Sequence, residues 1–291
     1  MFWYLLKMNK KELIKLLKKA LKEDCPKKDI TQKLIKLPNI STTAKVIVKK
    51  DGVFFGEQII KVLFEISDPK SKIIFFKHDG DLVQQGDIIC EIQSKSSVVL
   101  KIERVLLNFI QRLSGIATIT KKFVDKLGNS EIKILDTRKT TPLLRSLEKQ
   151  AVLAGGGYNH RFSLSDMVLL KENHLTELRK IHEIEKFSEL IKKFKAKNSK
   201  IKIEVEIETI QELEEIDLSE VDIIMFDEFP ITELEKAIQI CKNKNYKVEL
   251  EVSGNINLDN VHLYHDIPIN RISIGSLTHS FNALDLSLIC V

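Results

Sequence analysis

The chain has 291 residues, with 46 basic and 41 acidic side chains and a net charge of +5. This length and an apolar fraction of 43% allow a sizeable core in one large or two ordinary domains. So small a net charge argues against a general nucleic-acid surface, and no later segment offers the roughly 18 uncharged apolar residues of a membrane span.

Cysteine usage predicts a cytoplasmic protein. The four cysteines are far apart and form no CxxC motif, which is typical of free thiols in a reducing compartment: Cys25, Cys90, Cys241 and Cys290. The apolar start MFWYLL is too short for a signal peptide or a membrane helix, and Met8 is an alternative start.

The first third of the chain mixes helices and short strands. Apolar periodicity predicts helices at 9–23 and 57–64, and strands at 43–48 and 73–76. Residues 78–92 predict strand, glycine turn and strand. A long helix follows at about 98–127, on which Arg104, Asn108 and Arg112 form a polar stripe. We place a domain boundary at this helix, with one domain over 1–112 and the other over 113–277.

Strand and helix alternate strictly after the long helix. Such alternation predicts parallel strands joined by right-handed crossovers, and the number of units suits a barrel or an incomplete barrel better than an open sheet, which stays an alternative. The predicted strands lie near 132–136, 167–171, 201–208, 222–227, 247–252 and 271–275.

Cationic side chains are concentrated between positions 134 and 161. A strand there runs into Asp-Thr-Arg-Lys, Pro142 is expected at the first position of a helix, and Gly155 to Gly157 end that helix. Of only seven arginines in the chain, five lie between positions 104 and 161: Arg104, Arg112, Arg138, Arg145 and Arg161. Arginine grips carboxylate or phosphate with two parallel hydrogen bonds, so we predict a pocket for a small polyanion. Solvated loop charges are the alternative for any one of them.

Two predicted strands carry carboxylates on one face. Side chains alternate along a strand, so Glu204, Glu206 and Glu208 point the same way, and 248–252 repeats the pattern. Inside a barrel these groups need cationic partners, for which the 134–161 cations and Lys171 are candidates. A wet edge strand is the alternative. Asp227 ends another strand and could hold Mg²⁺ together with Glu206.

Small residues follow the last two strands, where barrels commonly bind phosphate on loop amides. Plain turns are the alternative for these residues: Ser253, Gly254, Asn255 and Gly275, with His279 one turn later.

Seven segments in this order carry a family resemblance: DTRKTTP, GGGYNHR, MVLLKENH, EVEIE, MFDE, EVSGN and SIGSLTHS. Together with ERVLLNFIQRLSGIAT, they resemble the nicotinate-nucleotide pyrophosphorylase (carboxylating) family, also called quinolinate phosphoribosyltransferase. The resemblance covers about residues 23–285. It implies an α/β protein with an N-terminal α/β sandwich, on which the C-terminal tail 278–291 packs, and an incomplete barrel of about six or seven strands. It further implies a homodimer with shared active sites.

The resemblance also implies an activity and residue roles. The enzyme would join quinolinate to phosphoribosyl pyrophosphate with loss of CO₂, giving nicotinate mononucleotide for NAD biosynthesis. Arg104 would come from the partner subunit, and the quinolinate carboxylates would be held by Arg138, Lys139, His160, Arg161 and Lys171. Glu206 and Asp227 would face the ribose and Mg²⁺, and Lys139 and Lys171 would share in catalysis with them. The 5′-phosphate would lie on Ser253, Gly254, Asn255, Gly275 and His279.

Two residues depart from the family pattern. Asn255 stands where Gly is usual, and Glu228 stands where Asn is usual. Asparagine tolerates a positive φ, whereas Glu228 adds negative charge near a pyrophosphate. Two other functions stay open: a barrel aldolase or isomerase that uses Lys171 as a Schiff-base amine, and a relative that binds an anion without turnover.

Overall fold

The computed structural model describes residues 8–36, 38, 40–128 and 130–291, so the apolar start and the choice between Met1 and Met8 lie outside the described residues. The chain divides into two compact units. The first unit comprises 1–121, 140–156 and 277–291, and the second comprises 122–139 and 157–276. None of the helices that the structure describes combines the length and hydropathy needed to cross a bilayer.

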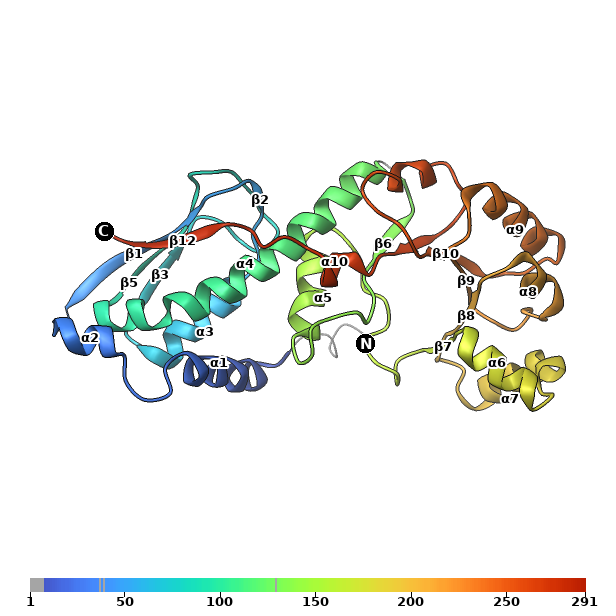
Figure 1. Cartoon of the computed structure of the whole chain (residues 1–291), viewed down its shortest axis with the longest axis horizontal. Coiled ribbons are helices and arrows are strands. Elements are labelled where there is room, and N and C mark those ends of the chain that lie inside the picture. The colour runs from blue at the N-terminus through green and yellow to red at the C-terminus, as the bar shows by residue number, and fades with distance from the viewer. Residues whose placement is uncertain (1–7, 37, 39, 129) are drawn as a thin grey trace. The chain divides into compact units, whose positions relative to one another are not determined.

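The first unit is an antiparallel sheet with helices packed beside it (Figure 1). The sheet has the order β12-β1-β5-β3, formed by Leu286–Cys290, Ser41–Val48, Ile88–Lys95 and Lys72–Phe75. A two-stranded ribbon pairs β2 (Gly52–Val53) with β4 (Leu82–Val83). The helices are α1 (Lys10–Asp24), α2 (Ile30–Ile35), α3 (Glu57–Ser67), α4 (Ser96–Leu127), α5 (Arg145–Ala154) and α10 (Ser276–His279).

Local sequence explains these elements. Asn9 and Glu12 form a capping box that starts α1, whose Leu13 and Leu17 are buried. Strand β1 alternates between exposed and buried positions, so Ala44, Val46 and Val48 face the core. The C-terminal strand β12 pairs with β1 and thereby joins the two ends of the chain in one sheet.

The second unit is an incomplete barrel of six parallel strands, as the alternation predicted. The order is β6-β11-β10-β9-β8-β7, formed by Lys133–Leu135, Arg271–Ser273, Glu249–Ser253, Ile223–Asp227, Ile203–Ile207 and Val168–Leu170. Helices α6 (Glu172–Lys180), α7 (Phe187–Lys197), α8 (Ile210–Glu215) and α9 (Ile231–Asn243) alternate with the strands, with short 3₁₀ turns η2 (Ile184–Lys186) and η3 (Val261–Tyr264). Within the described chain, β6 and β7 lie at the two ends of the strand order, so the ring stays open.

Two predicted boundaries need comment. Helix α5 begins at Arg145, not at Pro142, because Leu143 has a φ of 68°, which no helical residue adopts. Its end at Gly155 was predicted correctly. The boundary between residues 112 and 113 stays a prediction, since it falls inside α4, which continues from the first unit into the second.

Candidate functional site

Most predicted site residues lie at one end of the barrel in the second unit. Lys171 follows β7, Asp227 ends β9, Ser253 ends β10 and Gly275 follows β11. The carboxyl ends of parallel strands meet at one edge, where barrels bind their ligands. The strand order therefore gathers chemically useful groups from distant positions of the sequence.

Lys171 and Glu206 form an ion pair at this edge. The Glu206 side chain is 3% exposed, and burial raises its pKa to about 7, although Lys171 opposes the shift. The Asp227 carboxylate also acts on Glu206 and raises its pKa further. A carboxylate beside a second carboxylate in a buried position attracts cations strongly.

Arg138 and Arg161 approach each other in the same region. Burial lowers the pKa of Arg161, and the nearby Arg138 lowers it further, while Glu204 and Glu206 oppose this shift. The Arg161 guanidinium is half-buried and its Nη1 donates to the Met167 carbonyl at 3.1 Å. Two neighbouring guanidinium groups repel each other unless an anion lies between them, which favours an anion-binding role.

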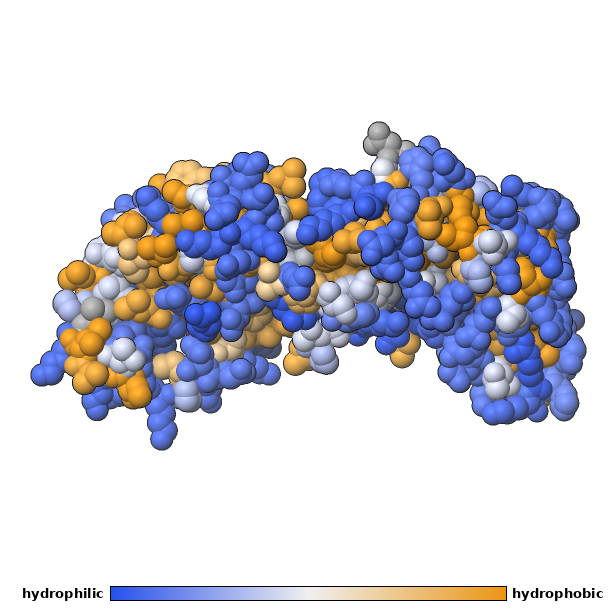
Figure 2. All heavy atoms as spheres, turned by 45° about the horizontal axis from the view of Figure 1, so that its top comes forward, coloured by the Kyte–Doolittle hydropathy of each residue, from blue (hydrophilic) through white to orange (hydrophobic). Residues whose placement is uncertain are grey.

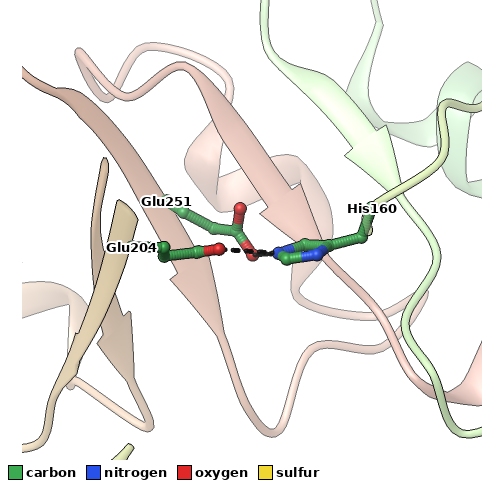
Figure 3. A group of neighbouring side chains, drawn as sticks. All are labelled: His160, Glu204 and Glu251. Atoms are coloured by element: carbon green, nitrogen blue, oxygen red, sulfur yellow. Dashed lines mark ion pairs between the residues drawn. The ribbon is translucent and has the colours of Figure 1, made fainter. Parts of the chain in front are cut away.

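His160 faces two buried glutamates. Its Nε2 lies 3.0 Å from Glu204 Oε2 and 3.4 Å from Glu251 Oε1, and Figure 3 shows the two carboxylates reaching the ring from neighbouring parts of the barrel. Both glutamates are 0% exposed. Burial lowers the pKa of His160, but the two carboxylates outweigh it and raise the pKa to about 10.

Three acidic side chains lie close enough to share a metal ion. One carboxylate oxygen each from Glu172, Glu206 and Glu208 lies within 4.8 Å of the others. All three donors are hard oxygen ligands, which suit Mg²⁺. The negative charge of Asp227 raises the pKa of both Glu206 and Glu208. The predicted pair of Glu206 and Asp227 therefore belongs to a larger acidic group.

The loop after β10 contains two residues with a positive φ, a conformation that glycine and asparagine adopt readily. Gly254 has a φ of 85° and Asn255 a φ of 53°, so asparagine is compatible with this turn, as expected. The Ser253 carbonyl accepts a hydrogen bond from Glu228 N–H at 2.9 Å, which ties this loop to the end of β9. Glu228 is exposed and also has a positive φ, of 57°.

The remaining predicted residues lie elsewhere, and two arginines of the cluster are used structurally. Arg104 is exposed on α4, and His279 ends α10 with its Nδ1 2.6 Å from Ser280 Oγ. Lys139 is exposed in the loop after β6, close to Arg138 in sequence. Arg112 binds Glu148, and Arg145 Nε donates to Thr140 Oγ1 at 3.0 Å, so these two arginines stabilise the first unit.

Sequence reasoning missed three contributors. Glu172 joins the acidic group, Asp136 accepts from the backbone N–H of His160 at 3.0 Å, and Arg271 lies 3.9 Å from Glu251. Glu172 directly follows Lys171 at a strand end, which is a usable signal. The sequence around Arg271 contains no pattern that predicts its contact with Glu251.

The chain matches two family models. Residues 29–114 match the quinolinate phosphoribosyl transferase N-terminal domain, and residues 116–289 match its C-terminal domain. The chain is 41% identical to a probable nicotinate-nucleotide pyrophosphorylase [carboxylating] of Bacillus subtilis, over 97% of this chain and 94% of that protein. A similarly named protein of Methanocaldococcus jannaschii is 37% identical, over 97% and 98%.

Solved structures agree with the sequence matches. NadC from Streptococcus pyogenes superposes with a TM-score of 0.87 at 35% identity, over 97% of this chain and 98% of that one. The nicotinate-nucleotide pyrophosphorylase from Francisella tularensis gives a TM-score of 0.87 at 34% identity, over 98% of each chain. Sequence, fold and the arrangement of charged groups thus agree, and the chain belongs to the quinolinate phosphoribosyl transferase family.

Proposed function

We propose that this protein is a decarboxylating quinolinate phosphoribosyltransferase of NAD biosynthesis. The observation that carries the proposal is the meeting of Arg138, Arg161 and Lys171 with the acidic group of Glu206 at one barrel edge. A dicarboxylate requires the cationic side chains. A sugar pyrophosphate requires cations for its phosphates and acidic groups for its metal ion.

Quinolinate would be bound through its two carboxylates. Arg138 and Arg161 supply guanidinium groups that already lie close together, and Lys171 and Lys139 supply ammonium groups from neighbouring loops. Paired arginines bind carboxylates with fixed geometry, so the pyridine nitrogen is oriented toward the sugar. His160 contacts this group of cations, because its Nδ1 accepts a hydrogen bond from the backbone N–H of Arg161.

Phosphoribosyl pyrophosphate would lie beside quinolinate. Its 5′-phosphate would lie on the loops after β10 and β11, where residues 253–255 and Gly275 offer backbone amides. Glu172, Glu206 and Glu208 fit Mg²⁺ by donor type and spacing, with Asp227 next to them. When bound, Mg²⁺ would offset the negative charge of the pyrophosphate.

The residues fit the electron flow of this reaction. The pyridine nitrogen forms a bond to the anomeric carbon with its lone pair, and the bond to pyrophosphate breaks with its electrons on the leaving oxygen. Glu206 and Asp227 stabilise the positive charge that develops on the sugar. The carboxylate beside the ring nitrogen then leaves as CO₂, its electron pair stays on the ring carbon, and that carbon takes up a proton.

The aldolase alternative lacks support from the structure. Its Schiff base requires a Lys171 amine that is available to a carbonyl carbon, whereas the Lys171 side chain is paired with Glu206. Incubation of the protein with quinolinate, phosphoribosyl pyrophosphate and Mg²⁺ decides the proposal. Nicotinate mononucleotide, CO₂ and pyrophosphate are expected in equal amounts, and their absence refutes this function.

We further propose a cytoplasmic homodimer in which Arg104 completes the partner's pocket. Exposed apolar side chains of the first unit, among them Ile30 at 79% and Leu34 at 81%, offer a surface for a partner, and hydrophobic side chains gather at the left end of the view in Figure 2. The four cysteines are free thiols. Mixing Arg104→Ala with Arg138→Ala, assayed at a quinolinate concentration at which each variant alone is nearly inactive, should restore part of the activity if sites are shared, because some mixed dimers then contain one intact pocket.

A further inference from the structure

The loop that carries Arg161 is fixed to the barrel at two places. The Asp136 carboxylate accepts hydrogen bonds from the backbone N–H of His160 at 3.0 Å and from the Asn159 side chain. The backbone N–H of Arg161 donates to His160 Nδ1 at 2.8 Å. The ring of His160 and the backbone of Arg161 therefore hold each other in one orientation.

The opposite side of the ring contacts the barrel interior. Because Nδ1 accepts from the backbone N–H of Arg161, the ring proton in this arrangement is on Nε2. Nε2 lies 3.0 Å from Glu204 Oε2 and 3.4 Å from Glu251 Oε1 (Figure 3).

Both carboxylates need this contact. Each is 0% exposed, and an uncompensated buried carboxylate is strongly destabilising. Arg271 gives Glu251 only a longer contact, with Nε 3.9 Å from Oε2, because its Nη2 pairs with Glu249. His160 Nε2 thus lies closer to Glu251 than Arg271 Nε does, and electrostatic attraction to the two carboxylates holds the ring in place.

We infer that Glu204 and Glu251 are positioning residues, which act through the His160 ring to hold the Arg161 guanidinium in the quinolinate pocket. Arg161 needs such support because the neighbouring Arg138 repels it before an anion binds. The inference rests on the proposed function, since it assigns the two glutamates a role in binding the dicarboxylate. Neither glutamate touches substrate in this role.

Glu204→Leu and Glu251→Leu test the inference. An apolar side chain of similar size removes the carboxylate without leaving a buried charge, a change that proteins often tolerate. We expect the KM for quinolinate to rise about tenfold in each variant, while the KM for phosphoribosyl pyrophosphate changes less than about twofold. A merely structural defect would raise both constants or lower the amount of folded enzyme.

Two further variants sharpen the test. Glu204→Gln and Glu251→Gln keep one acceptor oxygen for Nε2–H and should raise the KM for quinolinate only about threefold. They replace the leucine variants if those do not fold, and an unchanged KM in the glutamine variants then overturns the inference. In an Arg161→Ala background, a change at Glu204 should add no further effect, because both changes remove the same interaction.

Glu189→Gln is the control. It removes an exposed carboxylate on α7 that pairs with Lys193, and it should leave both KM values unchanged. Wild-type protein without turnover refutes the proposed function. Normal wild-type turnover with unaltered quinolinate KM in folded leucine variants, or full additivity with Arg161→Ala, refutes only the positioning role.

Discussion

The guanidinium of Arg112 binds the carboxylate of Glu148, with Nη2 2.7 Å and Nε 3.1 Å from Oε1. Glu148 is fully buried on α5, whereas the Arg112 side chain is 32% exposed on α4. The pair links two helices of the first unit that lie far apart in sequence. It shows that one of the clustered arginines stabilises the fold.

Arg112→Ala should therefore destabilise the protein by roughly 3 kcal/mol, because it leaves the Glu148 carboxylate buried with only hydrogen-bond donors for compensation. Urea unfolding measures the change. Lys180→Ala breaks the exposed pair with Glu177 and should cost less than about 1 kcal/mol. Equal effects of the two changes would show that Glu148 has other adequate partners.

Arg138→Ala should raise the KM for quinolinate about thirtyfold, which corresponds to the loss of about 2 kcal/mol from a charged hydrogen-bonding pair. Arg138 is only half-buried, so the circular dichroism spectrum should not change. Arg138→Lys should recover part of the loss, since lysine keeps the charge but not the planar fork.

Arg179→Ala serves as a control for Arg138. It removes an arginine that pairs with Glu212 on the helical side of the barrel, at 3.0 Å. Steady-state kinetics should give wild-type KM values for both substrates. A wild-type quinolinate KM in Arg138→Ala would contradict the assignment of the anion pocket.

Gly254→Ala should damage the loop after β10. A Cβ there would lie 2.5 Å from Glu228 Cγ and 2.8 Å from the Glu228 backbone nitrogen, at a φ of 85°. Gly86→Ala has a similar φ of 94° but meets nothing within 4 Å, so it should cost only about 1–2 kcal/mol.

The comparison of these two alanine variants separates backbone strain from steric clash. Gly254→Ala should be less stable than Gly86→Ala and should raise the KM for phosphoribosyl pyrophosphate, which Gly86→Ala leaves unchanged. Stability from urea unfolding and the two KM values are measured on the same preparations. A wild-type KM in Gly254→Ala would remove this loop from the phosphate site.

Glu251 should make stability fall as pH rises. Burial, together with the Glu204 carboxylate, raises the pKa of Glu251 to about 7, above its ordinary value of 4.5. The folded state therefore binds more protons than the unfolded state in this range, and the stability contributed by the protonated group is lost between about pH 4.5 and 7.

Glu251→Gln should remove much of this dependence. The free energy of unfolding of the wild type minus that of the variant should be larger at pH 5 than at pH 8, as measured by urea unfolding at each pH. The same difference at both values would mean that Glu251 titrates near its ordinary pKa in the folded protein.

Local sequence was sufficient for most elements and for the barrel. The alternation of glutamates with apolar residues predicts that Glu204 and Glu206 share one face of β8, and the strand-helix alternation fixes parallel order, because each crossover must return to the same edge of the sheet. The turn at Asn255 was also accessible, since few residue types tolerate its positive φ. These features depend on neighbours in sequence.

Only the tertiary structure decided which charges meet. Arg112 and Arg161 both belong to the arginine cluster seen in the sequence. In the structure, Arg112 binds the buried Glu148, whereas Arg161 lies beside Arg138. Glu208 alternates with Glu204 and Glu206 but is exposed, because β8 ends at Ile207. His160 meets Glu204 and Glu251 because the segment after α5 brings it to strands β8 and β10. Electrostatic pairing depends on distances between residues remote in sequence, which no local pattern encodes.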